Sequence, residues 1–193
     1  MGLGCVGVSS AFHCTKQGLK VIGFEKHEDS GAIGTASYGL TRIWRTSHDE
    51  HRYNDMQEGA LEVWREIEQR TGKEILVTTG MLWILHPSSQ TFKNVSAPGQ
   101  KGEVLSNAEM KKRYPALVAM PDDFVGFLAP KAGVVRANVG LHACKKLALE
   151  QGADLRYNSP VKAVDIMTGT VVLACGKIYR GKQIVISCGP LSD

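Results

Sequence analysis

Residues 1–12 of the chain are MGLGCVGVSSAF, with glycines at positions 2, 4 and 7. This G-x-G-x-x-G spacing allows a tight backbone turn, a close approach of the backbone to a ligand, and close packing of a helix on a strand. In folds that use such a turn, it follows a β-strand and opens a helix. Only Met1 precedes it here, so we expect the first strand of the sheet to be missing.

The residues after the turn agree with this pattern. Residues 6–17 are typical of a short helix that ends at Gly18, and the apolar run LKVIGFE at 19–25 is typical of a buried parallel strand with an acidic end. Glu25 follows Gly7 by 18 positions (25 minus 7), near the roughly 20 expected of an acid that binds ribose hydroxyls. A helix N-terminus favours phosphate. The residues therefore indicate a dinucleotide site, for either NAD or FAD.

The rest of the chain alternates further helix and strand patterns. Periodic apolar residues predict helices at 51–71 and 137–151, ended by Gly72 and Gly152. A capping box at Ser106 and Glu109 predicts a short helix that Pro115 stops. Segments 29–39 and 87–102 are expected to be loops. Apolar runs predict strands at 81–85, 124–130, 153–158, 161–166, 170–174, 177–180 and 183–187, the last of them buried.

Composition limits the classes of partner. With 193 residues, 43% hydrophobic and 22% charged, the chain has the balance of a globular protein. No apolar run approaches the roughly 18 residues of a membrane span, and no secretory leader is visible. The net charge of +4 is scattered, so no nucleic-acid partner is expected. Five cysteines without a C-x-x-C pair indicate reduced thiols and an intracellular setting.

One segment favours FAD over NAD. Residues 39–45 are GLTRIWR, and a helical segment LEVWREIEQRTG follows. In this order, with TGML at 79–82, GVV at 133–135 and VISCGPLSD at 185–193, the chain resembles the amine-oxidising flavoproteins of the sarcosine oxidase and pipecolate oxidase group. That group belongs to the D-amino-acid oxidase-like superfamily. The resemblance runs over the whole chain but covers only the N-terminal half of such a protein, so we expect a fragment.

The resemblance implies an α/β fold. A Rossmann-like FAD-binding domain, incomplete because its first strand is missing, would comprise residues 1–78 and 133–193. A partial antiparallel substrate domain, residues 79–132, would be inserted between these two segments.

The resemblance also implies roles for individual residues. Arg42 would lie at the isoalloxazine ring, Arg45 would bind the substrate carboxylate, and Tyr38 stands where sarcosine oxidase has an active-site histidine, which leaves the amine substrate open. Val161 would meet adenine through its backbone. The cofactor-binding residues implied are Gly2, Gly4, Gly7, Glu25, Lys26, Thr41, Arg42, Val161, Ser187 and Gly189. FAD would be non-covalent, since no cysteine here matches the attachment position.

The implied activity is oxidation of the C–N bond of a secondary or N-methyl amino acid. Hydride would pass to the flavin, water would hydrolyse the imine, and O2 would be reduced to H2O2. The parent protein would be a monomer in the peroxisome or cytoplasm. Two alternatives stay open, a dehydrogenase that uses another electron acceptor and a non-catalytic fragment. We expect the fragment itself to be inactive and poorly stable.

Two further groups of residues are weaker candidates. His48 and His51 have the spacing of a metal pair, but no other ligand completes it, so no metal is predicted. Trp64 and Trp83 are interpreted as core residues that do not stack on a cofactor.

Overall fold

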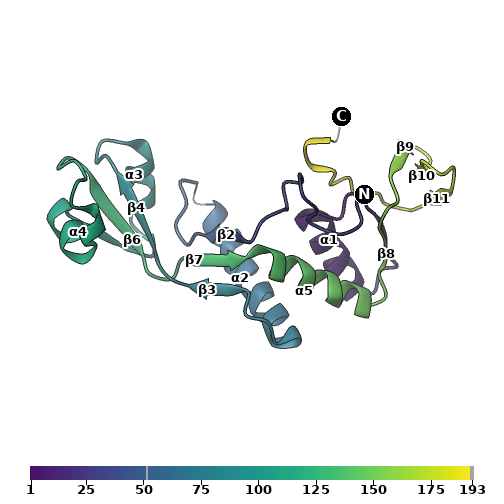
Figure 1. Ribbon diagram of the computed structural model, residues 1–193, viewed down its shortest axis with the longest axis horizontal. Coiled ribbons are helices and arrows are strands. Elements are labelled where there is room, and N and C mark those ends of the chain that lie inside the picture. Colours follow the sequence, from purple (N-terminus) through teal and green to yellow (C-terminus); the bar gives the residue numbers. More distant parts are fainter. Residues whose placement is uncertain (51, 192–193) are drawn as a thin grey trace. The chain divides into compact units, whose positions relative to one another are not determined.

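The computed structural model describes residues 1–50 and 52–191 (Figure 1). The chain forms two compact units, the first made of Met1–Thr41, Ile67–Ile75 and Arg136–Asp193 and the second of Arg42–Glu66 and Leu76–Val135. The expected domain boundaries differ mainly in placing 42–66 with the first segment. That those domains bind FAD and substrate stays a prediction.

Two helices pack together in the first unit. Helix α1 (Cys5–Lys16) contacts α5 (Ala137–Glu150), and the two bury Val8, Phe12, Leu147 and Ala148. Both helices end where they were predicted to end, because Gly18 and Gly152 adopt φ of +78° and +92° just beyond them. Such left-handed positions favour glycine and stop a helix.

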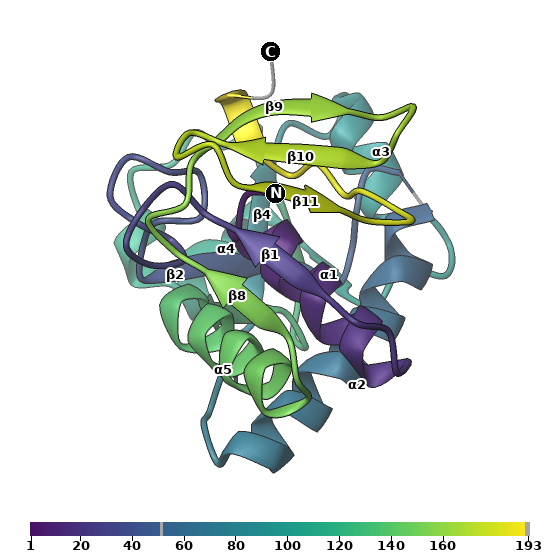
Figure 2. The same ribbon diagram turned by 90° about the vertical axis from the view of Figure 1, so that its right-hand side faces the viewer.

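Five short strands complete the first unit (Figure 2). Strand β1 (Ile22–Phe24) pairs in parallel with β8 (Asp154–Arg156), so that Gly23 lies opposite Leu155. The strands β9 (Val161–Asp165), β10 (Thr170–Leu173) and β11 (Ile178–Arg180) form an antiparallel sheet in the order β11-β10-β9. Phe24, Val171 and Leu173 form a small core. All five strands were predicted, with longer bounds.

The predicted buried strand at 183–187 is wrong. These residues have no assigned strand, and Val185 and Ile186 are about half exposed. The backbone of this segment bonds instead to Met1, whose N–H donates to the Val185 carbonyl and whose carbonyl accepts from the Ser187 N–H. Two such bonds do not make a ladder of regular strand pairs. A short 3-10 turn, η2 (Gly189–Leu191), follows.

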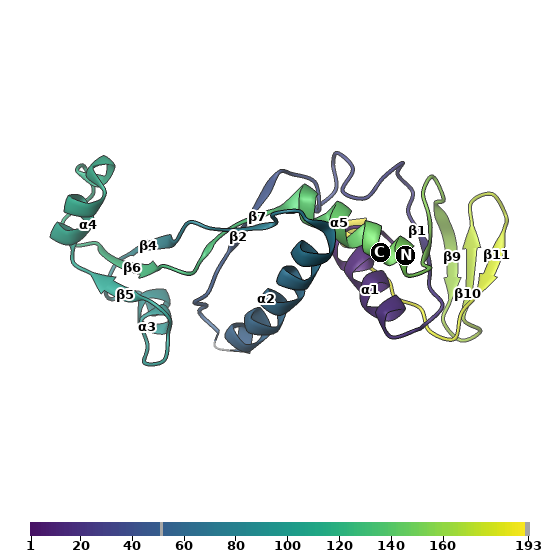
Figure 3. The ribbon, with the colours of Figure 1, turned by 90° about the horizontal axis from the view of Figure 1, so that it is seen from below.

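The second unit contains two three-stranded sheets, in the orders β2-β7-β3 and β4-β6-β5 (Figure 3). Helix α2 (Arg52–Thr71) contributes residues to both units and ends before Gly72 as predicted. The strands of the two sheets are β2 (Thr41–Trp44), β3 (Leu76–Thr78), β4 (Met81–Leu85), β5 (Glu103–Leu105), β6 (Val125–Ala129) and β7 (Gly133–Arg136).

The predictions for this unit are partly correct. Strands β4 and β6 are confirmed, and so is the capping box, which opens α4 (Asn107–Arg113) and is followed by the 3-10 turn η1 (Pro115–Leu117). The expected loop 87–102 is wrong in part, because Ser89 caps the Phe92 N–H and starts the helix α3 (Gln90–Val95). The strands β2, β3, β5 and β7 were not predicted. No helix among the described residues is long and apolar enough to cross a membrane.

Candidate functional site

The glycine turn that opens α1 tolerates no side chain at two of its positions. Gly2 has φ of +80°, and a Cβ built on it would lie 2.4 Å from the Ser187 carbonyl oxygen. A Cβ on Gly7 would lie 1.8 Å from the Gly2 carbonyl oxygen. Since real Cβ atoms do not approach backbone this closely, the turn and the helix can meet only through glycine.

The third glycine, Gly4, faces a serine of the glycine-rich loop. A Cβ on Gly4 would lie 2.7 Å from the Ser37 hydroxyl oxygen, which accepts a hydrogen bond of 2.9 Å from the Cys5 N–H. Gly4 itself caps α1 without a side chain, and the first turn contains no acidic residue. At the positive N-terminal end of the helix, the Cys5 N–H is therefore bonded to a neutral hydroxyl and not to a carboxylate. Ser37 was not predicted, because nothing in the sequence relates it to Cys5, 32 residues away.

Glu25 joins the same turn from the end of β1. Its carboxylate accepts hydrogen bonds from the Leu3 N–H at 2.8 Å and from the His27 N–H at 3.1 Å. The side chain is partly exposed. A carboxylate has about four lone-pair positions, so two further donors, such as ribose hydroxyls, can still be accepted.

Ser187 closes the turn from the C-terminal segment. Its hydroxyl oxygen lies 2.9 Å from both the Met1 and the Gly2 carbonyl oxygens, and its N–H donates to Met1 O at 2.8 Å. Gly189, two residues further on, has φ of +64° and begins η2. The side chain of Ser187 is therefore directed to the backbone of the turn.

The other residues expected to hold cofactor lie outside this hydrogen-bonded group. Val161 begins β9 and packs on the small core around Phe24. Lys26 is exposed and Thr41, the first residue of β2, is also exposed.

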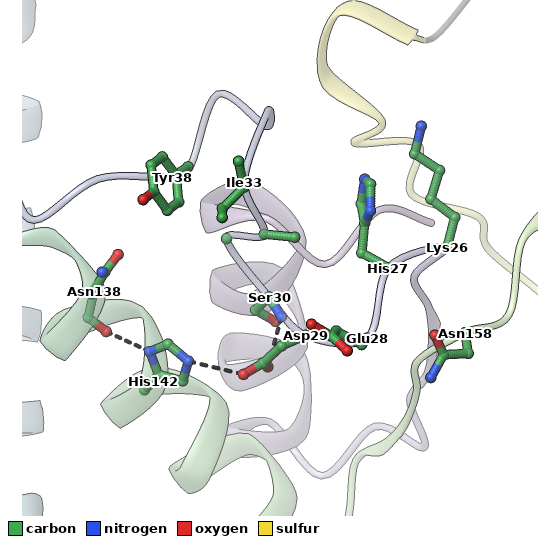
Figure 4. A pocket seen from close by; sticks show the side chains of 12 residues that line it. Lys26, His27, Glu28, Asp29, Ser30, Ile33, Tyr38, Asn138, His142 and Asn158 are labelled. Carbon is green, nitrogen blue, oxygen red and sulfur yellow. Dashed lines mark hydrogen bonds and ion pairs between the residues drawn. The ribbon is translucent and has the colours of Figure 1, made fainter.

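A cavity of about 580 Å³ lies next to the glycine-rich loop (Figure 4). Lys26 and Tyr38 line it together with residues of the loop and of α5. Figure 4 shows Asp29 directed toward His142, whereas Lys26 and His27 lie on the side of Asp29 away from His142. Tyr38 is exposed.

Asp29 anchors the start of that loop to α5. It accepts hydrogen bonds from Lys145 Nζ, from His142 Nε2 at 3.2 Å and from the Ser30 N–H at 2.7 Å. Burial opposes its ionisation, but these hydrogen bonds outweigh burial and place the pKa of Asp29 below its ordinary value. The Tyr157 ring lies under Lys145 and its hydroxyl is 2.8 Å from Ser30 Oγ. None of these pairs was predicted from the sequence.

The two predicted arginines belong to the second unit, on and just after β2. Arg42 is exposed. Arg45 is also exposed, and its guanidinium carbon lies 5.0 Å from the centre of the Trp83 ring. Among the residues that the structure describes, Arg45 has no carboxylate partner. Its guanidinium is therefore available to donate hydrogen bonds to an anionic ligand.

His48 lies close enough to Arg45 for the charge of Arg45 to affect the pKa of His48. Burial lowers the pKa of His48, and the positive charge of Arg45 lowers it further, against a hydrogen bond to the Arg45 backbone. Its ring is therefore neutral near pH 7. The other member of the predicted pair, His51, lies outside the described residues, and within the described part of the chain no group of three potential ligands could hold a metal ion.

Comparison with known proteins gives a consistent picture. The family described as FAD dependent oxidoreductase matches residues 1–193. Monomeric sarcosine oxidase of Streptomyces avermitilis is 29% identical over 195 residues, which cover 98% of this chain and 50% of that protein. Peroxisomal sarcosine oxidase of Homo sapiens is 28% identical, covering 100% and 50%. N-methyl-L-tryptophan oxidase of Yersinia pestis is 24% identical, covering 98% and 52%. The chain thus spans about half the length of the curated relatives it matches.

Solved structures show the same relationship. NikD, an unusual amino acid oxidase essential for nikkomycin biosynthesis, superposes in its open form with a TM-score of 0.82 at 25% identity. The match covers 99% of this chain and 50% of NikD. A fructosyl peptide oxidase from Aspergillus nidulans, at 15% identity and a TM-score of 0.76, shares the fold. The match covers 97% of this chain and 48% of that one.

Proposed function

The chain belongs to the FAD dependent oxidoreductase family, and from this premise we propose that it supplies the FAD-binding and carboxylate-binding parts of an oxidase acting on secondary or N-methyl amino acids. The names of the sarcosine oxidase and N-methyl-L-tryptophan oxidase relatives support this substrate class. The expectation from the sequence is the same, with O2 as electron acceptor.

The residues of the glycine turn fit FAD. Gly2 and Gly7 allow the turn to pack closely on the backbone of Ser187 and on itself, and the start of α1 carries no acid that would repel a pyrophosphate. Glu25 would accept from the ribose, Lys26 and the Val161 backbone would flank the adenosine, and Ser187 and Gly189 would support the turn. A bound FAD would supply the acceptor for the hydride, while the protein would supply position and charge.

Arg45 is the observation that carries the amino-acid part of the proposal. Its guanidinium lies over an indole, is exposed and lacks a carboxylate partner among the described residues. A planar guanidinium can bind a carboxylate through two parallel hydrogen bonds. Arg42 and Thr41 on β2 would lie at the isoalloxazine, where a fixed positive charge stabilises developing negative charge. Tyr38 would stand beside the substrate.

Turnover of candidate substrates tests the proposal. Because the fragment alone is expected to be inactive, the test uses the FAD-loaded protein extended to the length of its relatives. It is mixed with sarcosine or pipecolate, and flavin bleaching without O2 and peroxide release with O2 are measured. Bleaching with peroxide supports the oxidase, and bleaching without peroxide or O2 consumption would indicate another electron acceptor. Protein that holds FAD but is bleached by neither amino acid would contradict the proposed activity.

Arginine variants test the assignment of Arg45. Lysine keeps the charge but loses the planar fork, so in the protein extended to the length of its relatives Arg45→Lys is expected to raise the KM for the amino acid by about five- to thirtyfold with unchanged FAD content. Arg113→Lys is the control, because Arg113 is an exposed arginine of the same unit that is already paired with Glu103 at 2.5 Å. If Arg42→Lys raises KM and Arg45→Lys does not, the two roles are reversed.

A further inference from the structure

Arg45 differs from the ion-paired arginines of the chain in the group that it contacts. Arg52, Arg113, Arg136 and Arg156 each form an ion pair with a neighbouring carboxylate at 2.5–2.8 Å. Arg45 has no such partner among the described residues, and its contact is the ring of Trp83. An aromatic face attracts a guanidinium without using any of its N–H donors. The donors of Arg45 therefore stay available.

The indole of Trp83 is itself held firmly. Trp83 is the central residue of β4 and lies opposite Phe127 of β6 in the antiparallel pair. Its ring packs against a core of buried residues, which are Val95, Phe127, Ala129 and Ala132. The prediction that Trp83 is a core residue fits this packing. The core fixes one side of the side chain, and Arg45 lies over the ring.

The segment that carries Arg45 is anchored on its other side as well. Trp44, the last residue of β2, is buried, and Ser47 is completely buried. The His48 carbonyl accepts from Gln100 Nε2 at 3.2 Å. The backbone on either side of Arg45 is thus fixed, and the long side chain of Arg45 is the flexible part of the arrangement.

We propose that Trp83 is a positioning residue that holds the Arg45 guanidinium ready for the carboxylate of the amino-acid substrate. The inference rests on the proposed function, in which Arg45 binds that carboxylate. Trp83 need not touch substrate. It restricts the rotamers of Arg45 before binding, so that less conformational freedom is lost when the carboxylate arrives. An ion pair would restrict them too, but it would occupy the donors.

Two substitutions at Trp83 should weaken the positioning of Arg45 to different extents. Trp83→Leu removes the ring and Trp83→Phe keeps a smaller aromatic face. In the extended protein, loss of this ordering of Arg45 before binding is expected to raise the KM for sarcosine about two- to twelvefold in the leucine variant, less in the phenylalanine variant, with kcat and FAD content nearly unchanged. Trp64→Phe, a change to a half-buried tryptophan of α2, is the control and should leave KM unchanged.

Combining the changes separates positioning from packing. In an Arg45→Gln background, Trp83→Leu should cause no further rise in KM, because the group that it positions is gone. A merely structural tryptophan would add its full effect in both backgrounds, and that result would overturn the inference. An unchanged KM in Trp83→Leu would also overturn it. If instead Arg45→Gln itself leaves KM unchanged, the proposed carboxylate site fails.

A binding readout covers the case in which the leucine variant does not fold. The indole N–H signal of Trp83, identified by its loss in Trp83→Phe, is followed by NMR while acetate is added to the unmodified protein. A saturable shift that disappears in Arg45→Gln supports the coupling of carboxylate, Arg45 and Trp83. A Trp83 signal that does not move while acetate binds would contradict it.

Discussion

At the scale of single residues, Cys144 shows how burial controls reactivity. The thiol of Cys144 lies on α5, with its Sγ 3.9 Å from the Val8 carbonyl of α1, and burial raises its pKa to about 11. Because the thiolate is the reactive form, Cys144 is expected to be inert at pH 8 in the folded protein. Cys5 and Cys175 are exposed and should react quickly with a disulfide reagent.

Counting reactive thiols checks this expectation. Cys5→Ser and Cys175→Ser should each remove one rapidly reacting thiol. Cys144→Ala should remove none until the protein is unfolded. A Cys144→Ala variant that loses a fast thiol would show that the packing of α1 on α5 is looser than described.

His48 gives a prediction about pH at the same scale. Burial and the nearby Arg45 charge hold its pKa below the ordinary 6.5, so the unfolded chain takes up this proton at a higher pH than the folded one. Stability is therefore lost as pH falls below 6.5. Asparagine at position 48 cannot be protonated in this pH range. The free energy of unfolding of His48→Asn minus that of wild type should therefore increase as the pH is lowered from 7.5 to 5.5.

Urea unfolding of both proteins at several pH values measures this difference. Because the other histidines are present in both proteins, their effects cancel. A difference that stays constant with pH, or that moves the other way, would mean that His48 is not held neutral.

At the scale of elements, the sequence predicted those with a local cause. The helices α1, α2 and α5 end one or two residues before Gly18, Gly72 and Gly152, each of which has a positive φ, and α4 begins at its capping box. Strands of three residues, such as β3 and β5, are too short to show an alternating pattern. Segment 183–187 has the composition of a buried strand, but its backbone bonds to Met1 through two groups, which do not form a strand ladder. Whether a segment forms a strand depends on the strands that it pairs with, and these lie far away in the sequence.

Two glycines of the same helix should respond oppositely to alanine. Gly59 lies inside α2 and Gly72 just beyond it, and neither would bring a new Cβ within 4 Å of another atom. Gly59→Ala should therefore raise the free energy of unfolding by about 0.5–1 kcal/mol. Gly72→Ala, at φ of +66°, should lower it by about 1–2 kcal/mol.

Each glycine variant is the control for the other, since both add the same methyl group at an exposed position. Thermal or urea unfolding gives the two differences. Equal changes of the same sign would contradict the assignment of Gly72 as the residue that stops α2.

At the scale of the whole molecule, the candidate cofactor site joins residues that are remote in sequence. Gly2 meets Ser187, and Cys5 meets Ser37. The glycine spacing and the position of Glu25 could be predicted because each is a local pattern. The roles of Ser37 and of the Asp29 anchor could not, because a serine or an aspartate in a loop carries no sign of the group that it will meet.

This arrangement predicts that FAD stabilises the fold of the first unit, to which Gly2, Ser37 and Ser187 all belong. A ligand that binds only the folded state, present at a hundredfold its Kd, adds about 2.7 kcal/mol. For a chain of this size that corresponds to a rise in Tm of roughly 5–11 °C. Glu25→Ala removes an acceptor for ribose, at a cost of about 1.5–3 kcal/mol. At the same FAD concentration, the rise in that variant should therefore fall to about half or less.

The quantity to compare is the rise in Tm caused by FAD. Glu25 also accepts from the Leu3 and His27 N–H groups, so Glu25→Ala should lower the Tm of the protein without FAD as well. Glu150→Ala is the control, because Glu150 is an exposed acid of the same unit at the end of α5. Equal rises in Glu25→Ala and wild type would exclude Glu25 as the ribose acceptor. No rise in the wild-type protein would refute FAD binding by this chain, because a turn that binds the cofactor must transmit its binding energy to the fold that holds the turn together.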